Sequence, residues 1–83
     1  MIKTFTEKLS EENKKHLHEV VVPDLKGQFG AEVVADNEYG IVVLYRDYKA
    51  IERSYVLFAQ DTDGSLFANV EHHVIQDFIV ETT

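Results

Sequence analysis

Histidine is the residue type in this 83-residue chain best suited to bind a metal, and its four members form two sequence pairs, His16 with His18 and His72 with His73. Two imidazoles share a helix face when they lie three or four residues apart. Neither pair has that spacing, and the chain has no cysteine to supply a thiolate ligand. His73 and Asp77 are four residues apart, which is typical of an exposed helix pair. A site using all four histidines would require two helices to meet, so we predict no bound metal.

The stretch Asp61–Gly64 matches part of a calcium-binding loop. An EF-hand loop needs acidic ligands at positions 1, 3 and 5, glycine at position 6 and a bidentate glutamate at position 12. With Gly64 at position 6, Ala59 and Val70 occupy positions 1 and 12, and neither side chain can bind the ion. A hairpin turn with glycine at positive φ accounts for the same residues. We therefore predict a turn here and no calcium.

The hydroxyl and carboxylate side chains lack the sequence settings of catalysis. No serine lies in a Gly-x-Ser-x-Gly turn, and Gly27–Gly30 lacks the lysine and the preceding strand of a phosphate-binding loop. Fifteen carboxylates make chance pairs inevitable, so a pair alone does not indicate glycosidase chemistry. A chain this short also has little room for a deep pocket. We predict that the protein is not an enzyme and uses no cofactor.

A small basic and aromatic cluster surrounds the middle of the chain. Three tyrosines alternate there with three basic residues: Tyr45, Arg46, Tyr48, Lys49, Arg53 and Tyr55. Such a cluster can stack bases and contact phosphates. The alternative is that the two arginines pair with the neighbouring acids Asp47 and Glu52. Because the net charge of −7 repels phosphates, we predict no direct nucleic-acid binding.

Negative charge is concentrated in the C-terminal part of the chain. Residues 54–83 contain five acidic residues and no lysine or arginine, whereas residues 1–53 contain eight basic and ten acidic residues. The last thirty residues therefore supply −5 of the net −7. An acidic surface attracts basic partners before any contact forms. A surface that only keeps the protein soluble is the alternative.

Length and composition favour one small domain over residues 1–83. The absence of cysteine is more typical of intracellular than of secreted small domains. The N-terminus lacks the apolar segment of a signal peptide. The longest apolar runs, Val20–Val22 and Ile41–Tyr45, are too short to cross a bilayer. We expect a cytoplasmic protein that does not enter a membrane.

The elements that must position these residues begin with a helix. Thr4–Glu7 fits a capping box, and Ser10 offers a second start. The apolar residues that follow fall near one helical face, interrupted by Asn13. We predict one helix over residues 5–22, with a break at Ser10 as the alternative. Pro23 cannot extend it, and a loop follows.

Strand composition follows the predicted loop. Four segments are rich in β-branched and aromatic residues: Ala31–Asp36, Ile41–Tyr45, Arg53–Gln60 and Ser65–Ala68. Turn residues separate them at Asn37–Gly40, 47–52 and Asp61–Gly64. Connections this short imply an antiparallel meander of three or four strands. Neither central strand has a clearly polar face, so both faces of the sheet are expected to be apolar.

A closing helix is predicted over about residues 70–80, with Asn69 as its N-cap. Its apolar side chains share one face: Val70, Val74, Ile75, Phe78 and Ile79. A fifth strand over Phe78–Glu81 is the alternative. The predicted α+β fold is a small single domain with an N-terminal helix, the meander and a C-terminal helix packed on one sheet face. We expect both helices on that face, so the other must curl inward, be covered by residues 23–30 or bind another molecule.

These observations favour a non-enzymatic small acidic binding protein that acts through a protein–protein surface or as a small homo-oligomer, such as a homodimer. Tyrosine anchors interfaces because it buries a large area at low entropic cost. The residues predicted to bind the partner are Tyr39, Tyr45, Tyr48, Tyr55, Asp61, Asp63, Glu71 and Asp77. One alternative is an acidic inhibitor or nucleic-acid mimic that blocks a basic site on a partner protein. Another is a small metal-binding or enzymatic domain.

Overall fold

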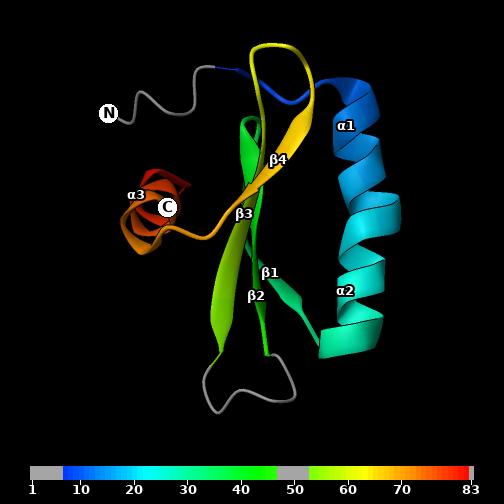
Figure 1. Cartoon of the computed structure of the whole chain (residues 1–83), viewed down its shortest axis with the longest axis vertical. Helices are drawn as coiled ribbons and strands as arrows, with labels where there is room; N and C mark the ends of the chain where they lie inside the picture. The colour runs from blue at the N-terminus through cyan, green and yellow to red at the C-terminus, as the bar shows by residue number, and fades with distance from the viewer. Residues whose placement is uncertain (1–6, 47–52, 83) are drawn as a thin grey trace.

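The computed structural model describes residues 7–46 and 53–82 and shows a four-stranded sheet between helices (Figure 1). The strands pair in sequence order and are β1 (Glu32–Asn37), β2 (Gly40–Tyr45), β3 (Ser54–Gln60) and β4 (Leu66–Asn69). Each strand is antiparallel to its neighbour. The predicted meander and its α+β class are confirmed. The predicted cap at Thr4 and the connection over 47–52 lie outside the described residues.

The N-terminal helix does not end before Pro23, so that prediction is wrong. Three helical segments form one continuous run: α1 (Glu11–His16), η1 (Leu17–Val21) and α2 (Val22–Phe29). In the π-helical segment η1, the N–H of Val22 donates to the carbonyl of Leu17, five residues back. Proline has no N–H to donate, and in a regular helix its ring clashes with the carbonyl four residues back. The wider π turn directly before Pro23 explains how the helix continues through it.

Both ends of this helical run are capped by local chemistry. Ser10, the second predicted start, is the N-cap, and its Oγ accepts the backbone N–H of Asn13 at 3.1 Å. Gly30 ends the run in the left-handed conformation with φ of 63°, and its N–H donates to the carbonyl of Lys26. Residues 23–29, predicted as a loop, are therefore helical.

The C-terminal helix α3 (His72–Thr82) confirms the predicted helix over the alternative strand. Ile75 and Phe78 are buried on its inner face. The predicted N-cap is wrong, because Asn69 is the last residue of β4. Its Oδ1 accepts the N–H of Glu71 at 2.7 Å, which turns the chain from the strand into the helix. Val70 precedes the helix and is exposed.

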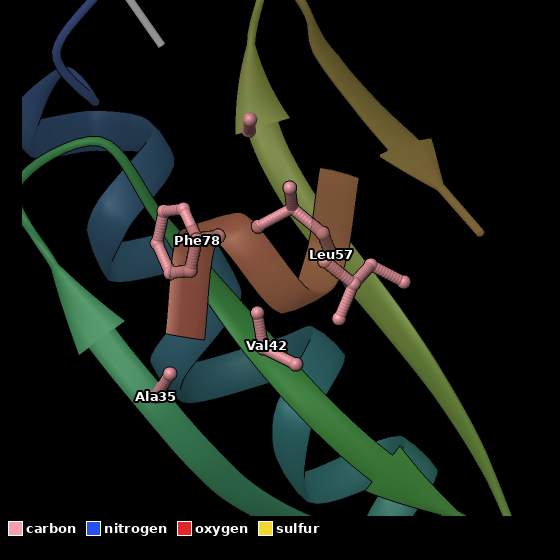
Figure 2. Packing of buried hydrophobic residues seen from close by; sticks show 6 residues of the cluster. Ala35, Val42, Leu57 and Phe78 are labelled. Atoms are coloured by element: carbon pink, nitrogen blue, oxygen red, sulfur yellow. The ribbon is translucent and has the colours of Figure 1, made fainter. Parts of the chain in front are cut away.

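The N-terminal helical run and α3 lie on opposite faces of the sheet, so the prediction that both cover one face is wrong (Figure 1). One core cluster joins the N-terminal run to the sheet through Leu17, Ala31, Ile41, Val43 and Val56. The other joins α3 to the sheet through Ala35, Val42, Leu57, Ala59, Ile75 and Phe78 (Figure 2). Alternate residues of β2 and β3 supply the two clusters, as expected for strands. Both apolar faces predicted for the sheet are thus covered by helices of the same chain.

The β1–β2 hairpin contains a glycine at which any side chain would collide with the neighbouring strand. Asn37 Oδ1 accepts the N–H groups of Tyr39 at 2.7 Å and of Gly40 at 3.2 Å, closing the predicted turn. A Cβ on Gly40 would lie 2.6 Å from the carbonyl oxygen of Phe58 and 3.5 Å from the ring of Phe78. The absence of a side chain therefore allows β2 to approach both β3 and α3.

The edge strand β1 contains a bulge. Val33 is opposite Val43 and Ala35 is opposite Val42, so Val34 is an extra residue on β1. The bulge places Val33 on the face of the N-terminal helical run and keeps Ala35 in the α3 cluster. Bulges on edge strands oppose pairing with another chain.

Candidate functional site

The sheet has two ends that differ in chemistry. One end is formed by the β1–β2 turn at Glu38–Tyr39 and the β3–β4 turn at Asp61–Ser65, and we call it the turn end. We call the open end the one where β2 ends at Tyr45 and β3 begins at Ser54. The pairing of β2 with β3 runs from the turn end to the open end. The described tyrosine and acidic residues predicted to bind a partner therefore do not lie at one end of the sheet.

Two hollows lie at the open end, and Tyr45 and Arg53 line both of them. The first has a volume of about 250 Å³ and is also lined by Phe29, Gly30, Glu32, Leu44 and Arg46. The second has a volume of about 520 Å³ and is also lined by Ser54, Tyr55, Val70, His72 and Ile75. The end of α2 and the start of α3 thus flank the same strand ends.

Tyr45 is held in place by the helix on its side of the sheet. Its ring packs against that of Phe29 with centroids 5.9 Å apart and planes at 60°. This is the edge-to-face arrangement that aromatic rings prefer. Phe29 is the last residue of α2, directly before the left-handed Gly30. Tyr45 is half-buried and in a defined orientation.

The open end also carries two arginines of the predicted basic cluster. Arg53 Nη1 lies 3.5 Å from Glu32 Oε1, and both side chains are exposed. Exposed ion pairs of this kind contribute about 0–1 kcal/mol. Within the described part of the chain, Arg46 has no ion pair. The alternative partners Asp47 and Glu52 lie outside the described residues.

At the turn end, a polar network joins the start of the helix to the β3–β4 turn. Gln60 Oε1 accepts the backbone N–H of Ser10 and the side-chain N–H of Asn13, each at 2.8 Å. Asn13 Nδ2 also donates to the carbonyl of Gly64 at 2.8 Å. This explains why Asn13 interrupts the apolar helix face. The network places the acidic first turn of α1 and the acidic β3–β4 turn at the same end of the molecule.

The β3–β4 turn has the conformation predicted for Asp61–Gly64. Gly64 has φ of 88°, and its N–H donates to the carbonyl of Asp61 at 3.0 Å. The Ser65 hydroxyl, and then its backbone N–H at 3.0 Å, donate to Asp63 Oδ1 and lower the pKa of that carboxyl. Asp61 Oδ1 accepts the N–H of Thr62 at 2.7 Å. Local hydrogen bonds therefore account for the carboxylate positions.

The eight residues predicted to bind a partner fall into separate groups. Tyr45 and Tyr55 come together at the open end, whereas Tyr39 is at the turn end and packs against the α3 cluster. Asp61 and Asp63 share the β3–β4 turn. The other two acids of the prediction are also exposed: Glu71 directly precedes α3, and Asp77 lies on α3. Tyr48 lies outside the described residues.

The four histidines do not come together. His16 and His18 are on the N-terminal helical run, and His72 and His73 are on α3, across the sheet. His18 Nε2 lies 3.4 Å from an oxygen of Asp36. His73 Nε2 lies 3.5 Å from Glu71 Oε2, whereas its predicted pairing with Asp77 is not formed. In residues 7–46 and 53–82, no group of three or more metal-ligating side chains could hold an ion.

Sequence reasoning missed several residues of the open end. Phe29 was assigned to a loop because Pro23 was expected to end the helix, and Val70 was assigned to the core face of the closing helix. Glu32 lies opposite Leu44 because β1 contains a bulge, and no glycine or turn residue in the sequence indicates that bulge. At the turn end, one available signal was Asn13, whose polar side chain on an apolar face required a partner.

Among the described residues, no helix is long and apolar enough to cross a membrane. Comparison of the chain with protein-family models, curated proteins and solved structures finds no match.

Proposed function

We propose that this chain is a non-enzymatic binding protein that recognises another protein through the open end of the sheet. The observation that carries this proposal is that two hollows meet at Tyr45 and Arg53. Tyrosine and arginine are the residue types that most often anchor interfaces, particularly beside pockets. Val70, which lines the second hollow, is apolar and 69% exposed, so a partner would remove it from water.

The structure changes where a partner is expected. The sheet faces no longer support a docking surface, since a helix covers each of them. At the open end, tyrosine can still anchor a partner. Tyr45 is already ordered by Phe29, so it would lose little conformational freedom on binding. The partner is a different protein or a second copy of this chain. Location in the cytoplasm stays a prediction from the cysteine-free composition.

Site-specific cross-linking tests this proposal. A photo-cross-linking amino acid replaces Val70 in one variant and Val20, an exposed valine of η1 away from the hollows, in the other. We expect the variant at 70 to form a cross-linked product in lysate of the native host, and mass spectrometry identifies the partner or a second copy. The same product from position 20 with equal yield, or none from position 70, would contradict the proposal.

A second candidate function is favoured by the polar network at the turn end. It gathers Glu11 and Glu12 of α1 with Asp61 and Asp63 of the β3–β4 turn at one end. Lys8, which precedes α1, is paired with Glu38 at 3.3 Å. In this candidate function, the acidic end blocks a basic site on a partner protein.

This second candidate predicts that association slows steeply as salt rises from about 0.05 to 0.3 M, because exposed charges are screened beyond the Debye length. Replacing Asp61 and Asp63 with asparagine should reduce the association rate more than replacing Glu71 with glutamine and Asp77 with asparagine. Stopped-flow measurement with a partner captured on the unmodified chain from native-host lysate at low salt gives both rates. A salt-independent rate would reject this candidate.

A further inference from the structure

Two arginines occupy neighbouring strand ends at the first hollow. The pairing of β2 with β3 reaches Tyr45 and Ser54 at the open end. Arg46 directly follows β2 and Arg53 directly precedes β3, and both line the hollow. Like charges at opposing positions of a hairpin repel each other. An anion between them would remove that repulsion.

Among the described residues that line this hollow, basic side chains outnumber acidic ones. Among the described residues that line it, Glu32 is the one acid, and it pairs with Arg53. Both members of that pair are more than 60% exposed, so the pair is weak and readily exchanged. The described lining residues therefore carry an excess of one positive charge in a chain whose net charge is −7.

The walls and size of the hollow narrow the class of anion. Phe29, Leu44 and Tyr45 contribute apolar surface to a lining that is otherwise mostly polar. Its volume of about 250 Å³ is smaller than the roughly 300–1,000 Å³ of most small-molecule sites. The net charge of the chain repels polyphosphates more than a single carboxylate. Guanidinium groups match a carboxylate with two parallel hydrogen bonds.

We propose that the first hollow binds a carboxylate next to an apolar side chain, within a peptide segment of the partner protein. This inference rests on the proposed function and names the chemistry of the partner. Arg46 and Arg53 hold the carboxylate, and the apolar side chain lies against Phe29 and Tyr45. Glu32 then shares Arg53 with the partner or releases it.

Two blocked dipeptides test the carboxylate directly. N-acetyl-Phe-Glu-amide and its neutral match N-acetyl-Phe-Gln-amide are titrated into the full ¹⁵N-labelled chain, and the arginine Nε–H and backbone amide signals are followed. We expect the acidic peptide to shift Arg46 and Arg53 and to bind about fivefold more tightly than the neutral one, the upper end for exposed ion pairs. Arg46→Gln should remove this preference, whereas Lys14→Gln on α1 should preserve it. The spectra also show whether each variant is folded.

Equal affinity for the two peptides, or no shift of either arginine, would overturn the inference. A stronger response of the arginines to inorganic phosphate than to the acidic peptide would also overturn it, because the site would then be one for phosphate. Equal peptide affinities together with cross-linking from position 70 would leave the proposed function standing without the carboxylate. A clear preference for the acidic peptide without such cross-linking would support the carboxylate site and count against the protein partner.

Discussion

At the scale of single residues, the β2 backbone passes close to β3 and α3 at Gly40. This glycine does not have positive φ, and its role is to leave space between β2, the carbonyl of Phe58 and the ring of Phe78. Gly27 differs, since a Cβ there would meet nothing within 4 Å and the residue lies inside α2. The two glycines therefore form a natural pair for comparison.

We predict that Gly40→Ala lowers the free energy of unfolding by about 1–3 kcal/mol, because the new methyl group overpacks the sheet. The matched variant Gly27→Ala should raise it by about 0.5–1 kcal/mol, because alanine restricts the unfolded chain and favours the helix. Urea denaturation of both variants measures the two changes. Equal effects of the two substitutions would contradict the close approach at Gly40.

Asn13 and Gln60 lie 47 positions apart and share a hydrogen bond of 2.8 Å. We predict that Asn13→Ala and Gln60→Ala each destabilise the fold by about 1 kcal/mol, the usual contribution of a hydrogen bond. A double-mutant cycle should give a coupling energy of about 0.5–1 kcal/mol. Gln28→Ala, which removes only the exposed contact to Asp24, is the control. Additive effects of Asn13 and Gln60 would show that the network is not formed in solution.

At the scale of elements, the strands could be predicted from sequence because their residue types and their turns agree. Asn37 and Gly64 lie where turn chemistry placed them. The end of the N-terminal helix could not be predicted, because the proline rule assumes regular α-helical geometry, whereas η1 is π-helical. The apolar character of both sheet faces was predicted correctly. The face that each helix covers depends on the path of the chain around the sheet edge. Residue patterns carry no information on that path, so the placement of the helices could not be predicted.

The π turn before Pro23 gives a prediction at this scale. Pro23→Ala should change the free energy of unfolding by less than about 1 kcal/mol, because the wider turn already accommodates the ring. Lys26→Pro, at an exposed position inside regular α2, should lower it by about 3 kcal/mol. Thermal and urea unfolding measure both. A stabilisation of about 3 kcal/mol by Pro23→Ala would mean that the proline strains the helix.

At the scale of the whole molecule, the sheet separates two cores. Ile41 belongs to the cluster of the N-terminal helical run, and Ile75 belongs to the cluster of α3. Both side chains are buried. The arrangement leaves the ends of the sheet, rather than its faces, as the surfaces on which a partner is expected. The open end has the aromatic and arginine residues, and the turn end has the acids.

This arrangement predicts additivity between the cores. Ile41→Val and Ile75→Val should each cost about 0.5–1.5 kcal/mol of unfolding free energy. Their effects in the double variant should add within about 0.5 kcal/mol, because the side chains lie on opposite sides of the sheet. Urea denaturation of the three variants provides the test. A larger coupling energy would indicate that the two side chains share one core.

The central claim is that a protein partner binds at the open end. The most direct test is amide hydrogen exchange of the chain alone and in complex with the partner captured by cross-linking from position 70. The proposal predicts slower exchange on binding at residues 44–46, 53–55 and 70–72, with residues 60–65 unchanged. Slower exchange at 60–65 and 10–13, with the open end unchanged, would contradict it and would favour the acidic turn end as the binding surface.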